Sequence, residues 1–288
     1  MRHVFLINPH AGKQDQTARI RALADRLAAA HNLDCRCLLT DRPGGAEVLS
    51  RALAETGEPV RIYACGGDGT VHEAANGIAG FPNAAMTVIP AGTGNDFLKN
   101  FGPDAAKFSD PEHLWDGPEF PLDLIDCNGR LCLTIACSGI DARIADTVHR
   151  YGNVPGLSGR GSYLLSVAVN FLFKPIGRRW RVELDGEVLE DDFALVSMCN
   201  GRYYGGGSMP VPEARMDDGV LETILVKKRA EAHLRPVVPG LLRRGVLEIS
   251  PHRPNGDVPA GGDHRRAPGR RTSSPVWTGR ASGAGRCG

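Results

Sequence analysis

The sequence predicts an α/β fold in which a domain built on a parallel sheet is followed by a second, β-rich domain. In the first hundred residues a short apolar run, a loop rich in Gly, Asn or Asp, and a helical pattern recur in that order. After about residue 121 strand-like runs separated by turn dipeptides replace this pattern. Strands that alternate with helices predict a parallel sheet covered on both faces, whereas runs joined by tight turns predict antiparallel strands.

The amino-terminal elements follow from this recurrence. Apolar runs predict strands at 3–7, 34–40, 61–65 and 85–90. Helical patterns predict helices over 16–31 and from about 45, 71 and 97. Ligands of open parallel sheets bind beyond the carboxyl ends of the strands, so we expect the site among the loops that follow these runs.

The second half of the chain reads as strands at 122–139, 178–201 and 219–228, with one helical stretch at 162–173. The dipeptides Asn128-Gly129 and Asp185-Gly186 predict tight hairpin turns. With a hinge near 118–121, the predicted domains are 1–121 and 122–228, followed by an atypical tail at 229–288.

Composition excludes several classes of protein. A formal net charge of +1 gives no reason to expect nucleic acid as a partner. We see no export signal and no run of about 18 apolar residues that would span a bilayer. The eight cysteines lack paired metal-ligand spacing and are read as reduced thiols. The expected location is therefore the cytoplasm.

The stretch "YACGGDGTVHEAANGI" carries the first indication of chemistry. Gly66, Gly67 and Gly69 let backbone N–H groups approach a polyanion at the start of a helix. The stretch has neither the ending of a Walker loop nor the spacing of a dinucleotide fingerprint. Because a carboxylate repels phosphate unless a cation or a proton intervenes, Asp68 indicates a magnesium-dependent kinase. The alternative is that Asp68 merely caps its helix.

Two further loops repeat this design. "PAGTGNDF" at 90–97 contains two glycines, a hydroxyl group and an Asn-Asp pair, and "NPHAGK" follows the first strand. Gly12 permits a tight turn there, and Asn8 or the amides after it can meet phosphate. Loops of this kind at one sheet edge can surround a nucleotide, whereas Lys13 reads as a solvated side chain.

These motifs, together with "NGRYYGGGSMPVPEARMDDGVLE", resemble bacterial diacylglycerol kinases and YegS-like lipid kinases in the same order over residues 1–228. The resemblance implies a Rossmann-like first domain of the NAD kinase and phosphofructokinase type and a β-sandwich second domain. It also implies a kinase that uses ATP and Mg²⁺ to phosphorylate a lipid hydroxyl at the membrane surface. An NAD kinase-like enzyme and a non-catalytic nucleotide-binding relative are the alternatives.

The resemblance also assigns residues. Asp68 is the catalytic candidate, and Glu73 would orient its loop by hydrogen bonding unless it is a plain solvated helix acid. A structural magnesium ion would be held by the Asp218 carboxylate and the carbonyls of Arg215 and Val220, unless Asp218-Gly219 is only a type I′ turn. The nucleotide would contact Asn8, Pro9, His10, Ala11, Gly12, Thr40, Gly66, Gly67, Asp68, Gly69, Thr70, Val71, His72, Glu73, Gly92, Thr93, Gly94 and Asn95.

Contact with the membrane is expected to be peripheral. Residues 170–180 combine apolar side chains, Trp180 and a basic cluster, as an interfacial segment does. Alternatively the apolar side chains at 164–173 pack the core of the second domain. The sequence leaves a homodimer open.

The tail departs from the family. The resemblance implies a terminal Asp-Gly-Glu whose acid is the general base, but residues 229–288 contain arginine without lysine among Pro, Gly, Ala and Ser. Such composition predicts disorder, either in a product of out-of-frame translation or in an arginine-rich binding tail. The Leu184–Glu187 stretch reads as a hairpin turn, so the general base stays unassigned.

Overall fold

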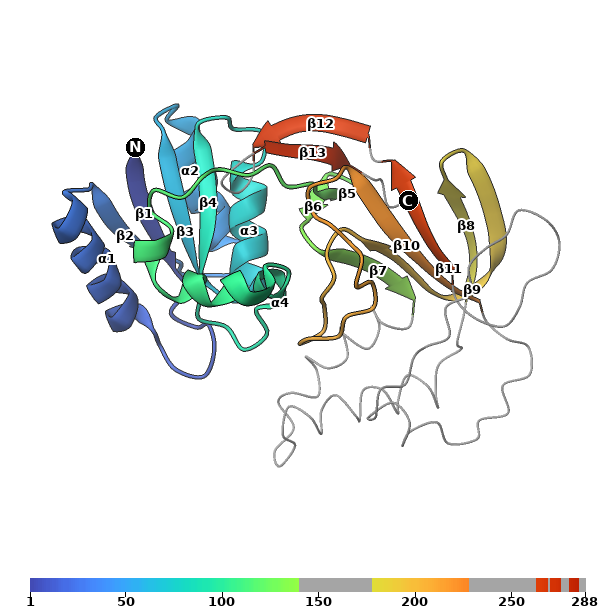
Figure 1. The fold of residues 1–288 in the computed structure, drawn as a ribbon, viewed down its shortest axis with the longest axis horizontal. Coiled ribbons are helices and arrows are strands. Elements are labelled where there is room, and N and C mark those ends of the chain that lie inside the picture. The colour runs from blue at the N-terminus through green and yellow to red at the C-terminus, as the bar shows by residue number, and fades with distance from the viewer. Residues whose placement is uncertain (140–177, 228–262, 269, 276–279, 285–288) are drawn as a thin grey trace. The chain divides into compact units, whose positions relative to one another are not determined.

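The computed structural model describes residues 1–139, 178–227, 263–268, 270–275 and 280–284 (Figure 1). Its contacts form two compact units: Met1–Ile135, Asn200–Val220 and Gly269–Gly288 in the first, and Ala136–Cys199 and Leu221–Pro268 in the second. This grouping differs from the consecutive domains expected from the sequence. One reason is that the backbone N–H of Asn200 donates to the Thr134 carbonyl at 2.7 Å, which ties the 200–220 segment to the first unit.

The first unit is built on a parallel four-stranded sheet, as predicted. Its strands are β1 (Arg2–Ile7), β2 (Cys35–Leu39), β3 (Val60–Gly66) and β4 (Ala84–Pro90), in the order β2-β1-β3-β4. All three pairings are parallel, so the four carboxyl ends share one edge of the sheet. The helices between them are α1 (Thr17–His31), α2 (Gly45–Glu55) and α3 (Asp68–Ile78), and the short α4 (Asp96–Lys99) follows β4 (Figure 1).

Both faces of this sheet are covered. Successive side chains of a strand point to opposite faces, so Phe5 and Ile7 of β1 join the buried residues of α1, including Ile20 and Leu27. Val4 and Leu6 enter the other cluster, together with the buried residues of α2 and α3. The near-continuous burial of β1, β3 and β4 follows from this arrangement.

A hairpin and two 3₁₀ segments follow α4. The 3₁₀ segments are η1 (Gly102–Ser109) and η2 (Pro111–His113), and the hairpin joins β5 (Ile125–Cys127) to β6 (Arg130–Cys132). Asn128 and Gly129 have φ values of 55° and 87°, as a type I′ turn requires, so this predicted turn is confirmed. Asn76 of α3 holds the hairpin: its side-chain amide donates to the Leu131 carbonyl at 2.8 Å and accepts from the Leu131 N–H at 2.9 Å.

The second unit contains a sheet ordered β11-β10-β9-β7, in which β8 also pairs with β9. Its strands are β7 (Ile135–Gly139), β8 (Arg178–Leu184), β9 (Glu187–Cys199), β10 (Val220–Lys227) and β11 (Asp263–Pro268). Asp185 and Gly186 have positive φ values between β8 and β9, which confirms the second predicted turn. Val182, Leu184, Phe193 and Leu225 form its buried cluster, and the helical stretch predicted at 162–173 lies outside the described residues.

Strands occur in the tail where the sequence predicted disorder. β11 joins the sheet next to β10, and β12 (Arg270–Pro275) pairs with β13 (Arg280–Ala284) in a separate antiparallel ribbon. An edge strand presents unpaired N–H and C=O groups, which can pair with an extended segment whatever its side chains are. Among the helices of the described residues, none has the length and apolar character needed to cross a membrane.

Candidate functional site

Three loops meet at the carboxyl ends of β1, β3 and β4. The loop after β1 is fixed by Asn8, whose backbone N–H donates to the Cys65 carbonyl at 2.9 Å. The Asn8 side chain donates to the Thr70 hydroxyl oxygen at 3.0 Å and accepts from the His10 N–H at 3.0 Å. Asn8 therefore connects the first loop to the start of α3.

The glycines of these loops are needed for close packing. A Cβ on Gly92 would overlap the Gly67 Cα, and one on Gly12, whose φ is 77°, would overlap the Ala91 carbonyl oxygen. A Cβ on Gly66 would overlap the Thr70 side chain. The three loops thus interlock through backbone contacts that side chains would prevent.

Asp68 joins the second loop to the third. Its Oδ1 accepts from the backbone N–H of Phe97, in the first turn of α4, at 3.1 Å. A Cβ on Gly94 would lie 2.8 Å from Asp68 Oδ2, so glycine leaves room for the carboxylate. Asp68 therefore caps α4 and not its own helix, and within the described chain no side chain caps the start of α3. The first N–H groups of α3 and its dipole accordingly favour an anion at the glycine loop.

Glu73 is neither part of the glycine loop nor a solvated acid. Its carboxylate accepts from the backbone N–H groups of Gly44 and Ala46, at 2.9 and 3.2 Å. It thereby caps α2 and fixes the segment after β2. Thr40, which directly follows that strand, is buried, and its N–H donates to the Ile7 carbonyl at 2.9 Å.

The remaining residues that were predicted to bind the nucleotide differ in their solvent exposure. Gly69 and Thr93 are exposed, whereas the Val71 side chain belongs to the core and its N–H donates to the Gly67 carbonyl at 3.1 Å. The His72 imidazole is partly buried in α3. Burial and, to a smaller extent, the nearby Arg130 lower the pKa of His72 from its usual value, which favours the neutral ring.

The predicted metal residues lie on a turn at 215–220 in the first unit. Asp218 is exposed, and its Oδ1 accepts from the Val220 N–H at 3.1 Å. Gly219 has a φ of 72°, but Asp218 is not among the residues with positive φ, so the type I′ alternative is wrong. The Gly219 N–H donates at 2.5 Å to Asp123, a buried acid that sequence reasoning did not single out.

Sequence reasoning also missed the polar residues of α4 and its carboxyl end. Asp96 is buried, its Oδ2 accepts from the Gly206 N–H at 2.7 Å, and its Oδ1 lies 2.5 Å from Lys99 Nζ. Asn100 Oδ1 accepts from the Arg202 N–H at 2.7 Å. The hydrogen bonds from Gly206 and Arg202 join residues 110 and 102 apart, so in the sequence only the Asn95-Asp96 pair was visible as a signal.

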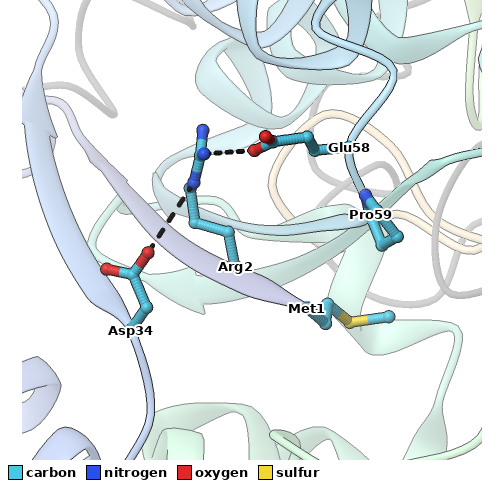
Figure 2. Close-up of a pocket in the computed structure, with 5 residues that line it drawn as sticks. All are labelled: Met1, Arg2, Asp34, Glu58 and Pro59. Atoms are coloured by element: carbon cyan, nitrogen blue, oxygen red, sulfur yellow. Dashed lines mark hydrogen bonds and ion pairs between the residues drawn. The ribbon is translucent and has the colours of Figure 1, made fainter.

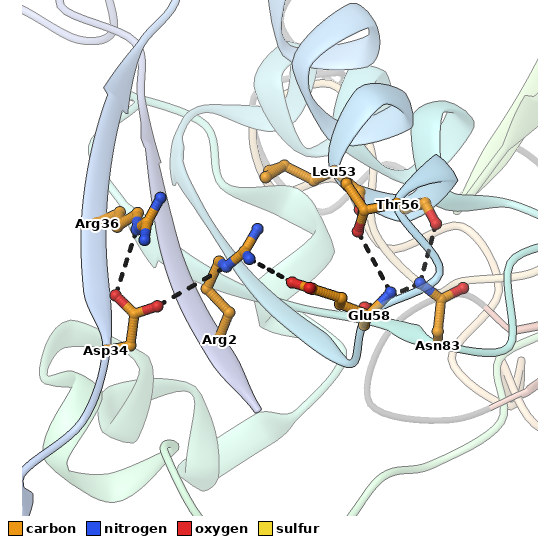
Figure 3. A network of polar contacts seen from close by, with 8 residues as sticks. Arg2, Asp34, Arg36, Leu53, Thr56, Glu58 and Asn83 are labelled. Atoms are coloured by element: carbon orange, nitrogen blue, oxygen red, sulfur yellow. Dashed lines mark hydrogen bonds and ion pairs between the residues drawn. The ribbon is translucent and has the colours of Figure 1, made fainter.

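The opposite edge of the sheet carries a different set of side chains. A hollow of about 320 Å³ there is lined by Met1, Arg2, Asp34, Glu58 and Pro59 (Figure 2). Arg2 pairs with both Glu58 and Asp34, and Asp34 also pairs with Arg36 at 3.3 Å (Figure 3). The charges of this network compensate one another at the amino ends of the strands, and the network lies apart from the three loops.

The segment proposed for membrane contact is described only at its end. Trp180 lies on β8 and packs, partly buried, against the cluster of Val182, Leu184 and Phe193. Trp180 therefore contributes to the packing of this cluster. The apolar side chains at 164–173 lie outside the described residues.

Comparison with known families gives two matches. The model described as "Diacylglycerol kinase catalytic domain" matches residues 2–127. The model described as "YegS C-terminal NAD kinase beta sandwich-like domain" matches residues 134–245, which extends past the predicted boundary at 228. With the parallel sheet observed here, these matches confirm the predicted fold class.

Curated proteins similar to this chain are named as lipid kinases or diacylglycerol kinases. A probable lipid kinase YegS-like of Pseudomonas aeruginosa is 31% identical over 202 residues, 64% of each chain. One from Pseudomonas syringae pv. syringae is 32% identical over 73% of this chain and 68% of the relative. A diacylglycerol kinase of Mycobacterium tuberculosis is 29% identical over 73% and 68%. The chain thus spans 64% of the length of the P. aeruginosa relative.

Solved structures agree with this likeness. A diacylglycerol kinase from Bacillus anthracis superposes with a TM-score of 0.61 and 25% identity, covering 92% of this chain and 83% of that chain. A further B. anthracis structure gives a TM-score of 0.65 at 24% identity, with 92% and 84% covered, and supports the fold alone.

Proposed function

Because the chain belongs to the family of YegS-like lipid kinases and diacylglycerol kinases, we propose that it transfers the γ-phosphate of ATP to the hydroxyl group of a lipid. One observation carries this proposal within the chain. Asp68 is held between two interlocked glycine loops, beside the start of α3 that no described side chain caps. Such an arrangement offers N–H donors to phosphate and one carboxylate to the reacting groups.

The loops would bind the nucleotide mainly through their backbone. The exposed Gly69 leaves the first turn of α3 accessible, and the α3 dipole favours the negative charge of the phosphates, whereas the Gly92 N–H donates to the Gly66 carbonyl at 3.2 Å. Asn8 fixes the first loop against Thr70, which keeps these donors in place before the ligand binds. Magnesium bound with ATP would neutralise charge on the transferred group. Asp68 Oδ1 accepts from the Phe97 N–H. We therefore assign the other carboxylate oxygen, Oδ2, to the side of the site where the phosphoryl group is transferred.

We also propose a structural magnesium ion at the 215–220 turn. The Asp218 carboxylate and the carbonyls of Arg215 and Val220 are hard oxygen donors, which is the set that Mg²⁺ prefers. The Asp218 carboxylate is exposed on this turn, and its Oδ1 accepts from the Val220 N–H at 3.1 Å. Within the described residues no three His, Cys, Asp or Glu side chains gather, so carbonyls and water would have to complete the shell.

The acceptor would be met at a membrane surface by a cytoplasmic protein in peripheral contact with lipid. Diacylglycerol, or a related lipid with a free hydroxyl group, is the acceptor class that the family supports. A non-catalytic nucleotide-binding relative is the second candidate, because residues 229–288 contain no Asp-Gly-Glu and no general base is assigned in residues 1–228.

The test is lipid-dependent release of ADP from Mg·ATP with diacylglycerol in mixed micelles. We expect Asp68→Asn to keep its hydrogen bond to the Phe97 N–H and its thermal stability, but to lose at least about 100-fold in turnover. Gly92→Ala should weaken nucleotide binding, because the new Cβ overlaps the Gly67 backbone. Gly117→Ala is the matched control, since its Cβ would meet its nearest atom at 3.5 Å.

Each alternative gives a different result. Turnover that requires NAD in place of lipid would identify an NAD kinase-like enzyme. Calorimetric binding of Mg·ATP without turnover on any acceptor would identify the non-catalytic relative. Unchanged nucleotide affinity in Gly92→Ala would overturn the site itself, and activity of Asp68→Asn within about tenfold of wild type would reduce Asp68 to a helix cap.

A further inference from the structure

The turn between β2 and α2, residues 40–45, lies beside the first loop of the site. The sheet order places β2 next to β1, and the Thr40 N–H donates at 2.9 Å to the carbonyl of Ile7, the residue before Asn8. Parallel strands align their carboxyl ends, so this turn shares the edge of the sheet that carries the three loops. A ligand that extends from those loops towards β2 therefore meets the turn.

Beyond Thr40 the turn has little support of its own. Asp41, Arg42 and Pro43 are exposed, and Gly44 has a φ of 80°. Within the described residues, its internal contacts are a hydrogen bond from the Gly45 N–H to the Arg42 carbonyl at 3.0 Å and an ion pair between Arg42 and Asp41. Because glycine loses much entropy on ordering and exposed ion pairs contribute little stability, the turn depends on a contact from outside.

Glu73 of α3 supplies this contact. Its Oε1 accepts from the Gly44 N–H at 2.9 Å and its Oε2 accepts from the Ala46 N–H at 3.2 Å, so both carboxylate oxygens are used. Hydrogen bonds to a charged acceptor are strong, and the dipole of α2 favours a carboxylate at its amino end. The turn is thus attached to α3, the helix that begins directly after the glycines at 66–67.

The two helices also pack closely against each other. A Cβ on Gly77 of α3 would lie 2.5 Å from the Glu47 carbonyl oxygen and 3.0 Å from the Arg51 backbone nitrogen, both in α2. The Arg51 side chain donates to the Asn76 carbonyl at 3.2 Å. Because this crossing fixes α2 against α3, Glu73 holds the turn at a constant position relative to the glycine loop.

The charges at the turn determine which part of a nucleotide it can receive. The Glu73 carboxylate occupies the position at the start of α2 where an anion would otherwise be favoured. Asp41 adds a second negative charge, and the Arg42 guanidinium pairs with Asp41 at 3.5 Å. A phosphate group would therefore be repelled from the turn, whereas an uncharged nucleoside would not.

We propose that Glu73 is a positioning residue that holds turn 40–45 against the nucleoside of ATP, while the glycine loop and α3 bind the phosphates. This inference rests on the proposed function, in which ATP is the phosphate donor. The role of Glu73 is indirect, because its carboxylate contacts the backbone of the turn and not the nucleotide. Loss of the carboxylate should thus weaken recognition of the nucleoside without weakening recognition of the phosphates.

The experiment measures by calorimetry the Kd of Mg·ATP and of Mg·tripolyphosphate, which lacks the nucleoside. We expect Glu73→Ala to raise the Kd of Mg·ATP about tenfold or more and to leave that of Mg·tripolyphosphate within about twofold of wild type. Glu73→Gln keeps one carbonyl oxygen as an acceptor, so its Kd for Mg·ATP should lie between those of wild type and Glu73→Ala.

Asp110→Ala is the matched control. The Asp110 carboxylate also accepts from a backbone N–H, that of Glu112 at 3.1 Å, but it caps the 3₁₀ segment η2. We expect this variant to bind both magnesium complexes as wild type does. The same selective loss of Mg·ATP binding in Asp110→Ala would overturn the assignment to Glu73.

Hydrogen exchange provides the second readout. In Glu73→Ala the amides of a peptide covering 40–46 should exchange about tenfold or more faster than in wild type, and in wild type ATP should slow this exchange more than tripolyphosphate does. Equal losses of affinity for both complexes, unchanged affinity for Mg·ATP, no binding of tripolyphosphate to wild type, or unchanged exchange in 40–46 would each overturn the inference. Selective loss of Mg·ATP binding in Glu73→Ala, without lipid-dependent release of ADP by wild type, would support the inference while contradicting transfer to a lipid.

Discussion

Individual acidic side chains in the first unit hold neighbouring segments by accepting hydrogen bonds from their backbone. A carboxylate forms strong bonds of this kind because it is charged. The four acids are Asp68, Glu73, Asp96 and Asp123, which accept from Phe97, Gly44, Gly206 and Gly219 respectively. Substitution of any one should therefore disturb a second segment, and its effects on activity have to be separated from effects on local order.

His3 provides a prediction about pH. It is only 3% exposed, its Nδ1 lies 2.9 Å from the Tyr63 hydroxyl, and burial followed by the charge of Arg61 lowers its pKa to about 4. Because the unfolded chain binds this proton near pH 6.5 and the native protein does not, stability is complete above pH 6.5 and falls between pH 6.5 and 4. By pH 5 the loss from His3 is at most roughly 2 kcal/mol.

Urea unfolding at pH 7 and pH 5 checks this prediction. His3→Asn keeps a polar group near the Tyr63 hydroxyl but cannot titrate, so its free energy of unfolding should fall less than that of wild type. Equal losses in the two proteins would show that His3 does not carry the effect.

Helices α2 and α3 pack closely where they cross at Gly77. A Cβ on Gly77 would lie 2.5 Å from the Glu47 carbonyl oxygen and 2.7 Å from the Ser50 Cβ. We expect Gly77→Ala to lower the free energy of unfolding by about 1–3 kcal/mol through overpacking, although alanine is the better helix former. This crossing also positions Glu73 against α2, so nucleotide affinity should fall as well.

Gly69→Ala is the matched control for stability in the same helix. Within 4 Å its Cβ meets nothing, so the propensity of alanine should leave stability unchanged or raise it by up to about 1 kcal/mol. Thermal and urea unfolding of both variants measure the difference. Equal stability of the two would contradict the close crossing.

At the scale of the whole molecule, the sequence and the structure differ on whether the tail after residue 228 is ordered. The sequence predicts disorder after residue 228, whereas the structure pairs β11 with β10. If this pairing forms in solution, amides in 263–268 should exchange at least about a hundredfold more slowly than those of an unfolded peptide. Exchange at the unfolded rate, with cleavage by trypsin that leaves a fragment ending near residue 228, would support the sequence prediction instead.

Local chemistry made the strands β1–β10, the helices α1–α4 and the two hairpin turns predictable, whereas the tail strands β11–β13 were not predicted. Apolar periodicity places β1, β3 and β4, and Asn128-Gly129 and Asp185-Gly186 adopt the positive φ values that their side chains permit. The gathering of the three loops at one edge also followed, because parallel strands align their carboxyl ends.

Contacts between distant parts of the chain were decided by tertiary packing alone. The capping of α2 by Glu73 joins residues 29 apart, and the hydrogen bond from Gly206 to Asp96 joins residues 110 apart. An acid looks the same in the sequence whether it faces phosphate, solvent or another helix, because its partner is chosen by backbone N–H groups that every residue except proline carries. Packing brings those groups within reach, and it therefore determined which acids hold the loops and which of them remains free to meet a ligand.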